Sequence, residues 1–175
     1  MQKIGLIFIF VMMVQAETIF DFDTNSNIAN WVIVDDVVMG GRSSGNFSIN
    51  QDGNGVFKGN VSIENNGGFS SLRYRKKMKT VPYTKVVLRV KGDGKAYQFR
   101  IKTKTLDYYS YIGPFTTTND WETIEITLSD MYPAARGRKL NFPNYTNEGI
   151  EEIAFLIGNK KTEDFILIID SISLR

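Results

Sequence analysis

A succession of short runs in which apolar and polar residues alternate is the feature that most constrains how this chain can fold. Within 84–91, for example, Val86, Leu88 and Val90 share one face and lysine and arginine occupy the other. This period of two is typical of a half-buried β-strand. Asp and Gly residues that tolerate tight turns separate the runs, as at 52–55. Because no window of a dozen residues keeps the apolar stripe of an amphipathic helix, the chain is predicted to be all-β.

The runs predicted as strands are distributed over most of the chain: 18–22, 31–34, 45–50, 55–63, 69–75, 84–91, 95–104, 108–115, 121–128, 150–158 and 164–174. So many short strands predict a single-domain β-sandwich of the jelly-roll type. The last run is apolar on both faces, which indicates a central strand. Residues 129–146 lack a strand pattern and are predicted to form a long loop that is functional or covers part of the fold.

Residues 1–16 have the pattern of a secretory signal peptide. Lys3 precedes an uncharged apolar run from Ile4 to Val14, and Val14-Gln15-Ala16 fits a small-x-Ala cleavage site. The apolar run is shorter than the roughly 20 residues that a membrane-spanning helix needs. The expected organisation is therefore a cleavable signal at 1–16 and one domain at 17–175, exported to the periplasm or secreted, with no stable membrane span.

Composition excludes several kinds of chemistry. The chain has no cysteine and no histidine, so thiol chemistry, Ser-His-Asp triads and His or Cys metal sites are ruled out. A net charge of +2 gives no general case for binding nucleic acid. Carboxylates for a glycosidase exist, but no spacing singles out a pair. The chain is therefore predicted not to be an enzyme and not to need a cofactor. Oxygen ligands in 21–36 could nevertheless hold a structural calcium ion.

Two stretches combine acids, glycines and arginines at turns: WVIVDDVVMGGRSSGNF at 31–47 and VSIENNGGFSSLR at 61–73. The adjacent Asp35 and Asp36 invite a catalytic reading, but neighbouring side chains of a strand point to opposite faces. They are instead expected to be structural, one bracing the Gly40-Gly41 turn and the other pairing with an arginine. Contact with a ligand is the alternative.

These two stretches, together with YQFRIKT, PAARGRKL and the C-terminal FLIGNKKTEDFILIIDSISL, resemble the complex I intermediate-associated protein 30 family. The resemblance extends over nearly the whole chain after residue 16. It implies a galactose-binding-like β-sandwich that is similar to some carbohydrate-binding modules. It also implies a role in assembly of respiratory complex I, without catalysis, for the mitochondrial members of the family.

The candidate ligand-binding residues are acids, amides, arginines and one tyrosine beside turns or on polar strand faces: Asp35, Asp36, Arg42, Asn65, Asn66, Arg73, Arg100, Tyr109, Arg136 and Arg138. Arginine suits a bidentate clamp on a carboxylate, and asparagine suits sugar hydroxyls. The structural alternative is that the arginines pair with Asp35, Asp36 and Glu64 and that Asn65 and Asn66 simply form a turn.

The aromatic residues of 97–115 are divided by the same alternation. Tyr97, Phe99 and Ile101 are expected to face the core, and at least one tyrosine of 108–111 should be exposed.

The predicted function is a monomeric, non-enzymatic module that holds a protein partner, as an assembly or chaperone-like accessory. The alternative is a module that binds an oligosaccharide on a concave sheet face.

Overall fold

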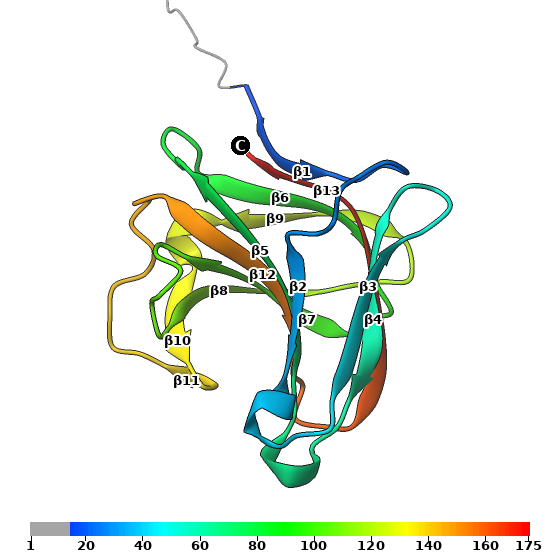
Figure 1. The fold of residues 1–175 in the computed structure, drawn as a ribbon. Helices are drawn as coiled ribbons and strands as arrows, with labels where there is room; N and C mark the ends of the chain where they lie inside the picture. The colour runs from blue at the N-terminus through cyan, green and yellow to red at the C-terminus, as the bar shows by residue number, and fades with distance from the viewer. Residues whose placement is uncertain (1–14) are drawn as a thin grey trace, which may run out of the picture.

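Two antiparallel β-sheets packed face to face form the computed structural model, which describes residues 15–175 (Figure 1). The strands are β1 (Glu17–Asp21), β2 (Trp31–Asp35), β3 (Ser44–Ile49), β4 (Gly55–Val61), β5 (Ser70–Met78), β6 (Lys85–Lys91), β7 (Ala96–Lys102), β8 (Ser110–Thr116), β9 (Trp121–Thr127), β10 (Tyr132–Ala135), β11 (Arg138–Lys139), β12 (Ile150–Ile157) and β13 (Glu163–Leu174). Within residues 15–175 the helical elements are three single 3-10 turns, η1 (Asp36–Met39), η2 (Glu64–Asn66) and η3 (Leu128–Asp130). The prediction of an all-β sandwich is confirmed.

The order of the strands in each sheet shows which strands are central. The six-stranded sheet runs β3-β4-β13-β6-β9, with β1 also paired to β13. The seven-stranded sheet runs β11-β10-β8-β7-β12-β5-β2. β13 lies between β4 and β6, which confirms the prediction from its two apolar faces.

The core lies between the sheets and is built from the inward side of the predicted alternation. Phe99 and Phe155 of the seven-stranded sheet are fully buried, as are Phe57 and Leu167 of the six-stranded sheet. Each such side chain contributes roughly 1.5–3 kcal/mol through its burial. Tyr97, Phe99 and Ile101 are all buried, as predicted.

A second aromatic cluster holds the N-terminal strands onto the sandwich. Trp31, the first residue of the long motif, is buried and stacks on Tyr74 with ring centroids 4.7 Å apart. Phe20, Phe22 and Phe47 pack around the same indole. The motif therefore begins with a side chain that fastens β2 to β1, β3 and β5.

The prediction of an irregular loop over 129–146 is wrong for its first half. β10 and β11 form a hairpin that extends the seven-stranded sheet beyond β8, and Arg136 and Gly137 adopt left-handed backbone at its turn. Pro133 and the alanines around it conceal this strand, because neither residue type favours β-structure. The second half is irregular and is anchored by the buried Tyr145, whose hydroxyl bonds the Thr80 hydroxyl at 2.8 Å.

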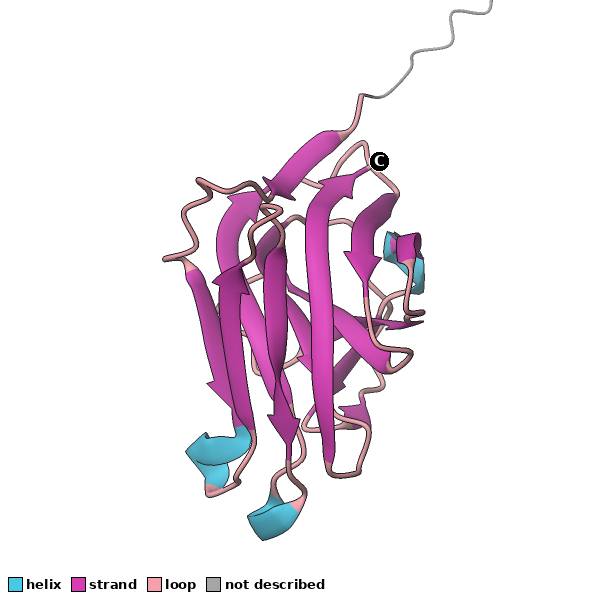
Figure 2. Ribbon diagram, turned by 90° about the vertical axis from the view of Figure 1, so that its right-hand side faces the viewer, coloured by secondary structure: helices cyan, strands magenta, loops and turns pink. Residues whose placement is uncertain are grey.

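Figure 2 shows that η1 and η2 lie together at one end of the sandwich, beyond the ends of the strands. The predicted signal segment falls almost entirely on residues 1–14, which lie outside the described part of the chain. In residues 15–175 there is no helix with the length and apolar character needed to cross a bilayer.

Candidate functional site

The structure separates the predicted site residues into three groups. The first group lies at the aspartate corner, which we define as residues 35–45 and 62–70 around η1 and η2, at one end of the sandwich. The second lies on the open face, which we define as the outward side of the seven-stranded sheet. The third lies around the β10–β11 hairpin. The corner contains Asp35, Asp36, Arg42, Asn65 and Asn66; the open face contains Arg73 and Arg100; the hairpin region contains Tyr109, Arg136 and Arg138.

Asp36 is the centre of the aspartate corner. Its side chain is fully buried and accepts hydrogen bonds from the Ser43 N–H at 3.0 Å, the Ser43 hydroxyl at 2.5 Å, the Gly68 N–H at 2.5 Å and the Phe69 N–H at 3.1 Å. Burial alone would raise the pKa of Asp36, but these hydrogen bonds outweigh it and hold the pKa below its ordinary value. One carboxylate therefore ties η1 to the turn that precedes β5.

The glycines of the two motifs make room for this carboxylate. A Cβ atom on Gly41 would overlap the Asp36 side chain, and one on Gly67 would lie 2.7 Å from Asp36 Oδ2. Gly40 ends η1 in the left-handed region with φ of 88°. The Gly-Gly pairs thus allow the backbone to wrap closely around one buried anion.

Asp35 serves a separate purpose, as strand geometry predicts. It accepts hydrogen bonds from the Ser70 hydroxyl at 2.6 Å and the Gly45 N–H at 2.8 Å. The expectation that it pairs with an arginine is wrong, because these donors hold it between β3 and β5. Arg42 pairs instead with Glu64 at 2.7 Å, where both side chains are exposed.

The remaining corner residues form a turn. Asn65 and Asn66 have φ of 54° and 61°, the left-handed backbone that asparagine tolerates better than most residues. The three carboxylates of the corner, those of Asp35, Asp36 and Glu64, all accept hydrogen bonds from the protein itself. The corner is therefore a structural joint, and contact of its residues with a ligand stays a prediction.

The residues of the hairpin group differ in their exposure to solvent. Tyr109 is half-buried and packs edge-on against Tyr111 and Phe142, while Tyr108 is 70% exposed. Arg138 is exposed on β11. The prediction that one of the tyrosines in 108–111 is exposed is confirmed by Tyr108.

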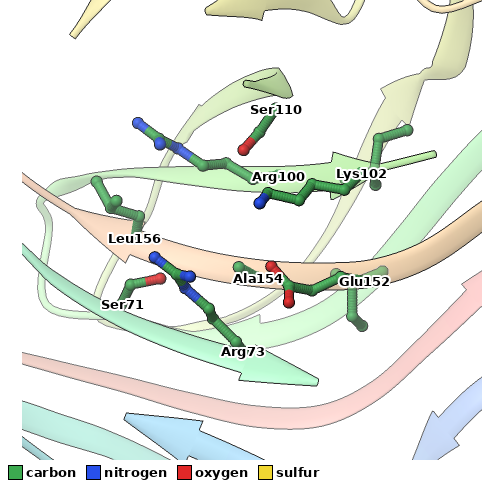
Figure 3. A pocket seen from close by; sticks show the side chains of 10 residues that line it. Ser71, Arg73, Arg100, Lys102, Ser110, Glu152, Ala154 and Leu156 are labelled. Atoms are coloured by element: carbon green, nitrogen blue, oxygen red, sulfur yellow. The ribbon is translucent and has the colours of Figure 1, made fainter. Parts of the chain in front are cut away.

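The open face brings together arginines that are far apart in the sequence. Arg73 on β5 and Arg100 on β7 are both cross-strand partners of Ala154, which lies on β12 between them. Side chains in register across adjacent strands point to the same side of a sheet. Figure 3 shows the two guanidinium groups on either side of β12, with the small side chain of Ala154 leaving a shallow hollow between them.

The neighbouring row of the open face carries three further charges, and each has an internal partner. Glu152 is buried and accepts a hydrogen bond from Arg75 Nε at 3.2 Å. Lys102, its cross-strand partner on β7, donates to the main-chain oxygen of Asp107 at 2.7 Å. Burial lowers the pKa of Lys102 below its ordinary value.

Arg73 and Arg100 differ from this row: within residues 15–175 neither guanidinium forms a salt bridge, as Arg75 does, or donates to main-chain oxygens, as Lys102 does. Arg100 donates from Nε to the neutral amide oxygen of Gln98 at 2.9 Å. Burial, and then the neighbouring charge of Arg73, lower the pKa of Arg100 to about 10, so it is still cationic at neutral pH. Arg73 and Arg100 are thus two positive charges of the open face that, in the part of the chain that the structure describes, are neither paired with an acid nor held by main-chain oxygens.

Sequence reasoning missed Lys102, Gln98 and Glu152 as parts of this surface. The first two were visible as the polar side of the β7 alternation, next to Arg100. Glu152 was hidden in the run IEEIAFLI, where nothing in the sequence distinguishes the buried Glu152 from its partly exposed neighbour Glu151. Its burial beside two cations is the physical reason that it is tolerated there.

Glu152 is the only carboxylate among the residues that line the hollow, so the hollow itself offers no pair of acids for glycoside hydrolysis. Between residues 15 and 175, no group of three His, Cys, Asp or Glu side chains is placed to hold a metal ion. Calcium binding in 21–36 stays a prediction.

A larger groove of about 600 Å³ lies at the end of the same sheet, between 77–81, 103–104 and 147–151, and contains none of the predicted site residues.

Comparison with known proteins identifies relatives of this chain. Residues 20–169 match the family model described as "Complex I intermediate-associated protein 30 (CIA30)". The mitochondrial protein of that name from Drosophila melanogaster is 22% identical over 147 residues, covering 71% of this chain and 50% of the relative. The Mus musculus protein is 23% identical over 193 residues, covering 94% of this chain and 57% of the relative. The chain thus spans about half the length of the curated relatives it matches.

These relatives overturn one prediction. Both carry "mitochondrial" in their names, so the prediction that this chain is exported to the periplasm or secreted is wrong. That prediction rested on residues 1–16 alone, because nothing in a folded β-sandwich reports its compartment. Cleavage of that segment stays a prediction.

Solved structures share the fold. The family 11 carbohydrate-binding module of a cellulosomal cellulase from Clostridium thermocellum superposes with a TM-score of 0.67 at 18% identity, covering 93% of this chain and 95% of the module. The Clostridium thermocellum family 11 module in complex with a β-1,3-1,4-mixed-linked tetrasaccharide gives a TM-score of 0.64 at 17% identity, covering 93% and 96%. At such low identity the likeness establishes the architecture of two packed sheets.

Proposed function

Because this chain belongs to the complex I intermediate-associated protein 30 family, as its sequence motifs indicated, we propose that it is a non-enzymatic assembly factor. In this proposal it binds protein partners, among them intermediates of respiratory complex I. The observation that carries the proposal is the extent of the family match, since residues 20–169 include both sheets, the aspartate corner and the open face. The relatives' names supply the association with complex I intermediates.

The chemistry of the molecule supports a binding role without catalysis. The acids that most resemble an active site, Asp35 and Asp36, are occupied by internal hydrogen-bond donors. The open face has unused hydrogen-bonding capacity, because the guanidinium groups of Arg73 and Arg100 lack a charged partner among residues 15–175. A hollow lined by a single carboxylate, which is engaged by Arg75, suits an accessory protein better than a carboxylate-based hydrolase.

Native gel electrophoresis of mitochondria from cells expressing the tagged full chain tests this proposal. We expect the chain to migrate with complexes far larger than its own 19.9 kDa, together with complex I subunits. Deleting its gene should lower the amount of assembled complex I. Migration only as the free chain, with normal complex I after deletion, would contradict the proposal.

Carbohydrate binding is the second candidate. The observation that favours it is the polar open face of a fold shared with carbohydrate-binding modules, where Gln98, Ser71 and the arginines could bond sugar hydroxyls. Affinity electrophoresis through a gel containing mixed-linkage β-glucan tests it directly. Retardation that is abolished by Arg100→Ala would support the carbohydrate role, and unchanged mobility in every glucan tried would count against it.

A further inference from the structure

We propose that the open face binds the carboxylate groups of an acidic peptide segment, with Arg73 and Arg100 as the two clamps. This inference deepens the proposed function, on which it rests, by naming the surface and the chemistry of the protein partner. It is carried by two guanidinium groups that lie in register across β12 and that lack a counter-charge within residues 15–175.

The charges of the open face divide into satisfied and unsatisfied ones. Arg75 and Glu152 neutralise each other, and Lys102 is held by main-chain oxygens of the β7–β8 loop. The Arg100 guanidinium has only the neutral Gln98 amide as a partner, and the Arg73 guanidinium forms no hydrogen bond to any part of the chain that the structure describes. Glu152 is engaged by Arg75, so no acid among the described residues is bonded to either Arg73 or Arg100. Two like charges held in this way destabilise a fold, and an external anion would relieve their repulsion.

The geometry suits carboxylates on an extended chain. β5 and β7 flank β12, so the Cα atoms of Arg73 and Arg100 are roughly 10 Å apart, twice the spacing of neighbouring strands. Side chains two residues apart on one face of an extended peptide are separated by roughly 7 Å. The long arginine side chains can bridge that difference, and each guanidinium can hold one carboxylate through two parallel hydrogen bonds.

The same surface is poorly suited to a neutral sugar. The row that contains the two arginines continues to Ile112 on β8 and Tyr132 on β10, so its one aromatic side chain lies at the far side. Lys139 already covers the Tyr132 ring at 5.1 Å. Neutral sugars are usually held by an exposed aromatic platform, whereas the centre of this face offers charge. These observations favour an acidic peptide over a glucan.

Isothermal titration of the full chain with a hexaglutamate peptide tests the inference, with a hexaglutamine peptide as the matched uncharged probe. We expect hexaglutamate to bind and hexaglutamine not to bind. Raising the salt concentration from about 50 to about 200 mM should weaken hexaglutamate binding, because exposed charge pairs are screened. Arg73→Gln and Arg100→Gln should each weaken it about tenfold or more, as loss of a charged hydrogen bond predicts.

Arg89→Gln is the control variant. Arg89 lies on β6 of the opposite sheet, over the Trp121 ring, and its replacement should leave hexaglutamate binding unchanged. Arg100→Lys keeps the charge but not the planar fork and should bind with intermediate affinity. Circular dichroism of each variant confirms that the sandwich is folded.

Several results would overturn the inference. They are absence of hexaglutamate binding to the folded wild type, equal binding by the Arg73→Gln and Arg100→Gln variants, and preference for polygalacturonate or mixed-linkage β-glucan over the peptide. Each of these leaves the proposed function standing if the wild-type chain still migrates with complex I subunits on native gels. Conversely, failure of that migration with intact peptide binding removes the proposed assembly role and leaves the peptide site.

Discussion

Charged side chains lie at the centre of both the aspartate corner and the open face, but the two regions differ in whether the protein itself supplies partners for those charges. At the corner, Asp36 is buried and accepts four hydrogen bonds from its own chain. On the open face, Arg73 and Arg100 are held in place by the sheet and have no acid to pair with. The corner contains the most recognisable sequence motif of the chain, and the open face contains the free binding capacity.

This difference shows that a distinctive motif need not mark a binding site. The motif at 31–47 is distinctive because many positions are constrained at once: glycines leave room for the Asp36 carboxylate, Ser43 donates to it, and Trp31 at the other end of β2 packs against Tyr74. Those constraints come from folding. A binding surface can instead be assembled from single residues on separate strands, each unremarkable in its own run.

Asp36→Ala should have the largest effect on stability. It removes a buried anion and leaves the Gly68 and Phe69 N–H groups without partners, so we expect a loss of about 3–5 kcal/mol. Urea unfolding followed by tryptophan fluorescence measures this loss. A cost below about 1 kcal/mol would mean that the corner is not a structural joint.

Gly41→Ala should destabilise the protein by about 1–3 kcal/mol, because the added methyl group overlaps the Asp36 side chain and forces the corner to rearrange. The control is the same substitution in the Asp36→Ala background, where the overlapping carboxylate is gone. There its cost should fall by at least half, as expected for residues in direct contact. Equal costs in both backgrounds would show that Gly41 is needed for another reason.

Acid should weaken the corner selectively. A carboxylate whose pKa is lowered on folding contributes stability that is present above its unfolded pKa of about 3.9 and is lost as the pH falls through the lower folded value. Urea midpoints between about pH 6 and pH 2 should therefore fall more steeply below about pH 4 for the wild type than for Asp36→Asn. Parallel curves for the two proteins would contradict the assigned role of the Asp36 charge.

Arg73→Gln should have the smallest effect on stability, and of the opposite sign. It removes a like-charge repulsion with Arg100 and breaks no salt bridge, so we expect a change between zero and a gain of about 1 kcal/mol. Urea unfolding of the Arg73→Gln and Asp36→Ala variants under the same conditions compares their free energies of unfolding directly. A loss of stability comparable to that of Asp36→Ala would mean that Arg73 belongs to the structural framework and not to a free surface.

The sequence predicts the strands well because alternation follows directly from the half-buried geometry of each one. It also separates Asp35 from Asp36, since their opposite directions follow from the strand that precedes them. It fails at β10, where Pro133 and alanines carry no strand signal and pairing with β8 and β11 decides the structure.

The open face lay beyond sequence reasoning for a different reason. Arg73 and Arg100 were both identified as candidates, but their proximity depends on the register of β12 against β5 and β7. Register is fixed by the packing of the whole sheet, so it cannot be read from either run alone. Glu152 was missed because a buried acid within an apolar strand makes sense only when its cationic neighbours are known.

The strand order has a consequence for how the chain reaches its folded state. β12 joins β5 to β7 in one sheet and β13 joins β4 to β6 in the other, so the last two strands in chain order supply the centres of both sheets. Until residues 150–174 emerge from the ribosome, the earlier hairpins keep open edges where those strands belong. Folding must then proceed through contacts between distant segments, which is slow and exposes the nascent chain to aggregation. A protein proposed to act in the assembly of others is therefore expected to need a chaperone during its own synthesis.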